Sequence, residues 1–217
     1  MKHVSILAFA ILLLVTACAV PVKPAMQRVS IPAPAMEKIP ATIGLVYTEE
    51  FQSHRHVQHL PSADTYTADL EVPIGAHSAE LFNQLADGMF ERSVSLGSKR
   101  TDNAGAAELD GVLEPAILSV HFGEIVLAGL GMKINGLILE YGIHLYDRDG
   151  KEILSWQILS SQPATDRKVT VFGFDELAGE LLEDAMRDIA AQFYAEFPSR
   201  PEVAAWLGKL REDASGH

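Results

Sequence analysis

Two periods of hydrophobicity alternate along the chain, one typical of strands and one typical of helices. Where apolar and polar residues alternate one by one, a half-buried strand is expected, because successive side chains of a strand point to opposite faces. The clearest examples are residues 66–72 and 137–146. Patterns of this kind, together with one short apolar run, predict strands at 43–47, 66–72, 109–122, 137–146 and 153–159.

Two of these strands carry additional signals. In 109–122 the alternation places Val112, Ala116, Leu118, Val120 and Phe122 in register, and Pro115 within it favours an edge strand or a bulge. Between the last two strands, residues 147–150 read Asp-Arg-Asp-Gly, and Asp-Gly is a strong hairpin signal. The C-terminal strands are therefore expected to pair as an antiparallel hairpin.

Helical spacing appears in three places. Residues 78–94 and 174–197 both repeat apolar residues every three to four positions, and Ser199 to Glu202 resembles a capping box that opens a last short helix. The resulting order of elements predicts an α/β (α+β) sandwich. It would have a mixed sheet of about four to six strands, two main helices packed on the sheet and a short C-terminal helix.

The first eighteen residues resemble the export signal of a bacterial lipoprotein. Residues 4–15 are apolar except for Ser5. This run is shorter than the about 20 residues that a membrane-spanning helix needs, and it has the length of a signal-peptide core. Val15-Thr16-Ala17-Cys18 resembles a lipobox, which implies cleavage before Cys18 and acylation of that cysteine. Ala19 after it implies sorting to the outer membrane by resemblance to enterobacterial lipoproteins. The alternative is a secreted protein that keeps Cys18 as a free thiol.

The next segment, residues 18–40, contains five prolines and little periodicity. Proline favours extended conformations, so these residues are expected to form a semi-rigid tether after the signal peptide 1–17. A single α/β periplasmic domain is then expected over residues 41–217.

The composition of the chain excludes a class of partner and a kind of covalent link. The chain has 217 residues, 48% of them hydrophobic, and a net charge of −12. Such an acidic chain repels phosphate backbones, so nucleic acid is not an expected partner. The single cysteine excludes an intrachain disulfide.

Three short stretches carry a family resemblance: residues 43–47, 109–113 and 145–153. With the final helix, they are similar to periplasmic lipoproteins of the LpoB, CsgG and TolB N-terminal type, and YajG-like lipoproteins fit as well. The resemblance implies a non-catalytic binding or scaffolding accessory of an envelope assembly, anchored in the membrane and engaging an envelope protein. A homo-oligomer is left open. The alternatives are a lipid- or lipopolysaccharide-handling accessory and, least favoured, an envelope enzyme.

Candidate chemistry is sparse. The chain has no G-x-S-x-G, H-E-x-x-H or S-x-x-K motif, so neither catalysis nor a cofactor is expected. His54, His56 and His59 are weak candidates for a zinc or copper site, against the alternative of a solvated loop, and no metal is expected.

One apolar segment has no obvious structural role. Residues 125–132 are unusually apolar for the loop that their glycines suggest, and Gly129-Leu130-Gly131 lacks the spacing of a phosphate loop. The segment could bury in the body, or meet a partner or a lipid. A partner surface including Leu130 and Met132 is favoured.

Overall fold

The structure is a computed structural model. It describes residues 20–22, 29–60, 68–98, 109–123, 125–128, 131–134, 136–163, 169–170 and 174–215.

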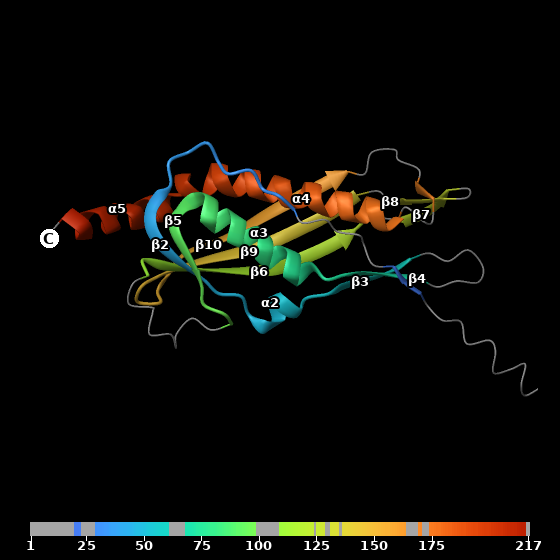
Figure 1. The fold of residues 1–217 in the computed structure, drawn as a ribbon, viewed down its shortest axis with the longest axis horizontal. Helices are drawn as coiled ribbons and strands as arrows, with labels where there is room; N and C mark the ends of the chain where they lie inside the picture. Colours follow the sequence, from blue (N-terminus) through green and yellow to red (C-terminus); the bar gives the residue numbers. More distant parts are fainter. Residues whose placement is uncertain are drawn as a thin grey trace, which may run out of the picture.

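A mixed five-stranded sheet forms the centre of the molecule, with two long helices on one face (Figure 1). In their order across the sheet, given next, the first three strands pair antiparallel and the last three pair parallel. The sheet order is β10 (Glu152–Pro163), β9 (Gly136–Asp147), β6 (Gly111–Phe122), β2 (Ile39–Leu45) and β5 (Phe90–Ser95). The helices are α3 (Ile74–Met89) and α4 (Phe174–Glu196), followed by the 3-10 turn η3 (Phe197–Ser199) and α5 (Pro201–Ser215). The predicted α+β sandwich is therefore confirmed.

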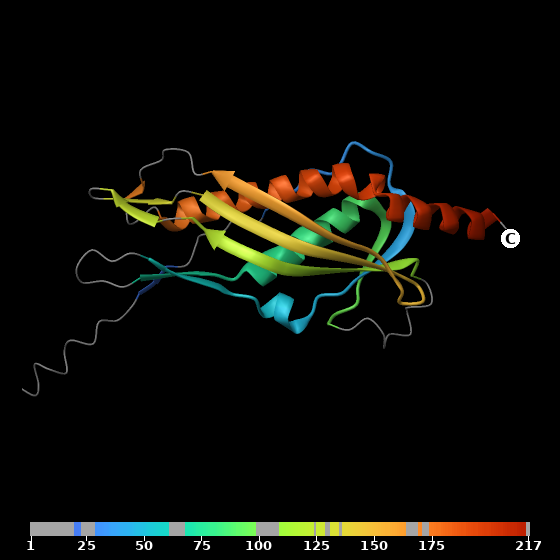
Figure 2. The same ribbon diagram turned by 180° about the vertical axis from the view of Figure 1, so that it is seen from behind.

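Two small sheets extend the body at the end away from the C-terminus (Figures 1 and 2). One is β1 (Val20–Val22), β4 (Ala68–Val72) and β3 (His56–Leu60). The other is β11 (Val169–Thr170), β8 (Gly131–Ile134) and β7 (Ile125–Ala128). The short helix α2 (Glu49–Ser53) lies between β2 and β3 in the chain.

The core fills the space between the sheet and the two helices. Phe82 of α3 meets Tyr141 of β9 edge to face at 5.1 Å between ring centroids, and it lies 6.4 Å from Phe193 of α4. The Tyr141 hydroxyl is buried and forms a 2.7 Å hydrogen bond with Ser78, whose hydroxyl also contacts the Ile74 carbonyl. A polar pair is therefore satisfied inside an otherwise apolar core.

The helix predicted over 78–94 is wrong at both ends. It begins four residues earlier, directly after Pro73, and ends at Met89. Residues 90–95 form β5, which runs parallel to β2 with Ser93 beside Ile43. Phe90 fits the helical spacing, yet it is buried in the strand, where it meets Phe197 at 5.9 Å. Sheet pairing therefore overrides the helical pattern at this point.

The strand predicted at 109–122 is confirmed, but its register is wrong. A bulge between Ile117 and Ser119 makes Leu118 an extra residue against β9, which reverses the faces beyond it. Val120 and Phe122 consequently lie on the core side, whereas Leu118 is 47% exposed. Pro115 lies where β2 has already ended, since β2 pairs only with 111–113. β6 is an interior strand and its bulge lies at Leu118, so the edge-or-bulge expectation is met only in that no residue of β2 pairs with Pro115.

The segment expected to be a tether packs onto the body from residue 29. Val29 is buried, and Gln84 of α3 holds the backbone around it. The Gln84 amide donates to the Val29 carbonyl at 2.8 Å, and its oxygen accepts from the Ile31 N–H at 2.9 Å. Further back, β1 pairs in parallel with β4, with Val20 beside Ala68. Residues 29–40 thus belong with the folded body.

Candidate functional site

The face of the sheet opposite the helices carries the largest exposed aliphatic side chains of the described residues in the main sheet. None of the described helices covers β6, β9 and β10 on this side (Figure 2). Leu118, Ile138 and Leu159 are 47%, 39% and 50% exposed, and each comes from a different strand. We call this region the open face; register and burial place on it Glu114, Ala116, Leu118, Ser119, His121, Ile138, Glu140, Gly142, His144, Ser155, Gln157, Leu159 and Ser161.

The three aliphatic residues surround a carboxylate. Glu140 stands directly opposite Leu159 of β10, and Ile138 is its next neighbour on the same face of β9. Leu118 lies over Gly142, where an added Cβ would be 3.4 Å from the Leu118 side chain. Glycine therefore leaves room for Leu118 to lie across the strand, and the patch is continuous over three strands.

The electrostatics of the open face favour a partner of opposite charge. It contains Glu114 and Glu140 but neither lysine nor arginine. It also contains two histidines, His121 and His144, and His144 faces Glu152 at 3.3 Å between Nδ1 and Oε2 and stacks on Tyr146. An anionic phosphate would be repelled here, whereas an apolar surface with basic side chains would be attracted.

Beside the open face, strand β10 forms an edge of the sheet. Among the described strands it pairs only with β9. The Gln192 side chain of α4 donates to the Leu159 carbonyl at 3.0 Å, which satisfies one group of this edge. The strand contains one charged residue, Glu152, at its start. An extended segment could therefore add to this edge next to the patch.

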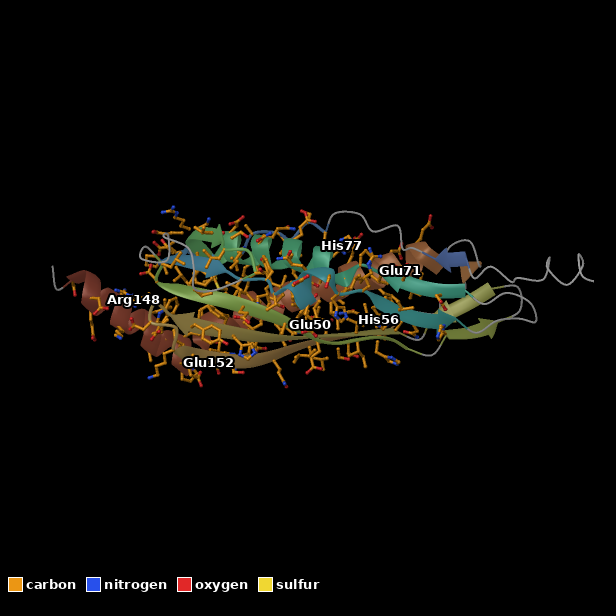
Figure 3. The ribbon with its side chains drawn as sticks, turned by 90° about the horizontal axis from the view of Figure 1, so that it is seen from below. Glu50, His56, Glu71, His77, Arg148 and Glu152 are labelled. Carbon is orange, nitrogen blue, oxygen red and sulfur yellow. The ribbon has the colours of Figure 1, made fainter. Side chains whose placement is uncertain are left out.

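Three pockets lined by described residues lie at the end bearing α5. Their volumes are about 220, 330 and 420 Å³, and charged side chains line each of them. The first lies between Asp110, Asp149, Trp206 and Lys209. Arg148 and Glu152, at the same end, are labelled in Figure 3. None of the three pockets has the apolar lining that acyl chains require.

Groups with shifted pKa values are dispersed rather than gathered. Burial raises the pKa of the Tyr47, Tyr141 and Tyr194 hydroxyls, and Asp87 adds to the effect at Tyr47 and Tyr194. Burial lowers the pKa of His56 and His77, which lie on β3 and α3 (Figure 3). None of these five lines the three pockets. The described residues do not assemble an acid–base constellation in a cleft.

The candidate metal ligands do not converge. His56 and His59 are three residues apart in β3, so they lie on opposite faces of it. His56 bonds Gln58 at 3.2 Å and packs on Phe122, while the exposed His59 pairs with Asp69. His54 ends α2 instead of continuing the strand. No group of three or more metal-ligating side chains occurs among the described residues.

In the apolar segment 125–132, where a loop was expected, the described residues belong to the strands β7 and β8. β7 and β8 form an antiparallel hairpin, with Leu127 opposite Met132. Met132 is thus in a strand, whereas Leu130 lies outside the described residues. Cys18 lies outside them too. Among the residues that are described, no helix combines the length and apolar character needed to cross a bilayer.

Sequence analysis missed the open face. Its signal was a large aliphatic residue in the polar phase of a strand: Ile138 beside Glu140 and His144, and Leu159 between Gln157 and Ser161. Leu118 is in the same phase as Glu114 and Ala116, but the predicted register grouped it with Val120 and Phe122, which the bulge places on the other face.

Comparison with known proteins yields fold similarity only. No family model matches the sequence, and no curated protein matches it. A Xanthomonas campestris protein of the DUF330 family is 11% identical over 91% of this chain and 99% of that one, with a TM-score of 0.50. A homologue of a neuraminyllactose-binding hemagglutinin from Helicobacter pylori, itself described as putative, is 12% identical over 86% and 100%, with a TM-score of 0.41. PelC from Paraburkholderia phytofirmans, solved as a dodecamer, is 15% identical over 74% and 94%, with a TM-score of 0.34.

Proposed function

We propose that this chain is a lipid-anchored accessory of the bacterial envelope that binds a protein partner on the open face of its sheet. The anchor is Cys18, in the outer membrane and facing the periplasm, as its lipobox-like context predicts. The patch formed by Leu118, Ile138 and Leu159 carries the binding part of the proposal. Exposed aliphatic side chains on three adjacent strands lose water on contact with an apolar partner, at about 25 cal/mol per Å² buried.

Three observations favour binding over the alternatives. The three described pockets are lined by charged side chains, which disfavours lipid carriage through them. The groups with shifted pKa values are scattered, which gives catalysis no support. The open face lacks lysine and arginine, so its partner is expected to be a protein surface with apolar and basic side chains rather than an anionic lipid.

The binding part is tested by photo-crosslinking in cells. A photoreactive residue replaces Gln157 on the open face, and crosslinked products are identified by mass spectrometry. In the background of Leu118→Ser, Ile138→Ser and Leu159→Ser, the same product should disappear while the protein level stays unchanged. Val57→Ser is the matched control, because Val57 is 56% exposed but lies on β3. A product that survives the triple substitution refutes the open face as the docking surface.

The anchor is tested separately. Metabolic labelling with an alkyne fatty acid should mark the wild type and not Cys18→Ala, and membrane fractionation should place the labelled protein in the outer membrane. Label retained by Cys18→Ala would show that this cysteine is not the acylation site.

A further inference from the structure

The two edges of the main sheet differ in how they are protected against pairing. β5, at one edge, has six residues, and Glu91 and Arg92 are exposed charges within it. β10, at the other edge, has twelve residues, and its charged residue Glu152 and its proline Pro163 stand at its two ends. Charges, prolines and bulges are the usual means by which edge strands avoid pairing. Residues 154–162 of β10 are therefore an edge without this protection.

The hydrogen bonds of β9 show which backbone groups of β10 face outward. The Gly123 N–H donates to the Gly136 carbonyl at 2.8 Å, so residue 136 and every second residue after it bond toward β6. The alternate residues of β9 bond toward β10, where Leu139 stands opposite Ser160. The residues of β10 whose N–H and C=O groups point away from the sheet are consequently Ser155, Gln157, Leu159 and Ser161. The Gln192 side chain agrees with this assignment, because it reaches the Leu159 carbonyl from α4.

A strand added to this edge would continue the open face. The four residues with outward backbone groups also have exposed side chains on that face. A side chain of the added strand opposite Leu159 would stand in one row with Leu159 and Glu140. Because adjacent strands are about 4.8 Å apart, a lysine or arginine in this row would extend over Leu159 to Glu140.

The helix side of the edge carries a second carboxylate. The Gln192 amide donates to the Leu159 carbonyl and to Asp188 Oδ2, each at 3.0 Å, so Asp188 lies close to the edge. Arg200, a cation on this side, lies over the Trp156 ring and is paired with Glu196 at 3.3 Å. Carboxylates therefore flank the edge on both faces of the sheet.

Charge decides between two possible occupants of the edge. A second copy of this chain would bring the same carboxylates and a net charge of −12, so like charges would oppose its pairing. An extended segment of a basic partner would meet charges of opposite sign at Glu140 and Asp188. The electrostatics therefore favour the basic partner.

We propose that the partner binds through an extended segment with apolar and basic side chains, which adds to β10 as a further strand of the main sheet. This inference rests on the proposed function, because it concerns the same partner and specifies how that partner binds. Backbone hydrogen bonds to β10 supply affinity, and side chains over Leu159 and near the two carboxylates supply specificity. Since Gln192 already serves the Leu159 carbonyl, pairing is strongest at Ser155 and Gln157.

The test separates pairing of the backbone from contact of the side chains. A photoreactive residue again replaces Gln157 in cells, and the crosslinked product is compared between Ser155→Pro and Ser155→Ala. Because the Ser155 N–H points away from β9, proline at this position removes an outward donor and leaves the ladder with β9 intact. Ser155→Pro should reduce the product about tenfold, whereas Ser155→Ala should leave it unchanged. Urea denaturation checks that each variant is folded, and Ser161→Pro with Ser161→Ala replaces the pair if Ser155→Pro does not fold.

The outcomes distinguish this inference from the proposed function. Loss of the product with proline but not with alanine supports strand addition. A product that survives proline but disappears with Leu118→Ser, Ile138→Ser and Leu159→Ser overturns strand addition and leaves docking on the open face intact. A product that survives both sets of substitutions overturns both proposals. A product with the mass of two copies of this chain identifies a second copy as the occupant and overturns the inference of a basic partner.

Discussion

The two faces of the central sheet are built from the same strands but differ in what covers them. On β9, Leu139, Tyr141 and Ile143 point into the helices and are fully buried, while Ile138 on the alternate face is 39% exposed. The covered face holds the fold together, and the open face is not needed for that purpose. The large aliphatic residues on the open face are therefore the basis of the proposal that this face contacts something outside the chain.

The largest expected effect on stability is on the covered face. Phe82→Ala should destabilise the protein by about 3–5 kcal/mol, because a ring that meets Phe51, Tyr141 and Phe193 is lost and leaves a cavity. Urea denaturation followed by circular dichroism measures this. Val57→Ala, at an exposed site, should change the free energy of unfolding by less than about 0.5 kcal/mol. Equal effects at the two sites would contradict the assigned core.

A smaller effect is expected for the buried polar pair on the same face. Tyr141→Phe should cost about 0.5–1.5 kcal/mol, the usual net contribution of one hydrogen bond. The Ser78 hydroxyl keeps its 2.8 Å bond to the Ile74 carbonyl, so no buried group is left unpaired. A double-mutant cycle with Ser78→Ala isolates the coupling between the two hydroxyls. A coupling energy near zero would show that the Ser78–Tyr141 bond contributes nothing.

The extent to which this arrangement could be predicted differs by element. Strict alternation fixed the faces of β9 and β10, and the Asp-Gly turn was correctly placed, with Gly150 at φ +79°. The bulge at Leu118 could not be predicted, because it depends on pairing with β9 and not on local pattern. Phe90 satisfies both a helical stripe and a buried strand, so only the parallel pairing with β2 decides between them.

The candidate site was harder to predict for a related reason. Residues 125–132 were recognised as unusually apolar, but their glycines suggested a loop, and the hairpin pairing of Leu127 with Met132 follows only from the fold. In contrast, Ile138 and Leu159 could have been noticed as aliphatic residues in polar phases. Their significance required knowing that none of the described helices covers them.

Protonation of His56, on β3, should change the free energy of unfolding less than the loss of core packing does. His56 lies against Phe122, where burial lowers its pKa, with neighbouring His54 and His121 adding to the decrease and the bond to Gln58 opposing it. The unfolded chain therefore binds the proton at higher pH than the folded one. The stability that neutral His56 contributes is fully present above the ordinary pKa of 6.5. It is lost as the pH falls from there through the lowered pKa.

Urea denaturation at pH 8 and pH 5 measures this loss. His56→Gln should reduce the difference between the two midpoints, whereas Val57→Ala, at the exposed neighbouring position, removes no ionisable group and should leave it close to that of the wild type. A His56→Gln protein with an unchanged pH dependence would assign the loss to other groups.

The smallest expected change in stability is on the open face. Leu159→Ser should alter the free energy of unfolding by no more than about 0.5 kcal/mol, because a half-exposed side chain in the polar phase of β10 has little to lose. The same substitution should nevertheless weaken the in-cell crosslink from position 157, since Leu159 faces any partner docked there.

Ile158→Ser is the matched control at the neighbouring position. Ile158 is buried on the covered face, so this substitution should destabilise the fold strongly. If Leu159→Ser destabilised the protein as much as Ile158→Ser, its side chain would be part of the core. If it changed neither stability nor crosslinking, the open face would have no share in binding.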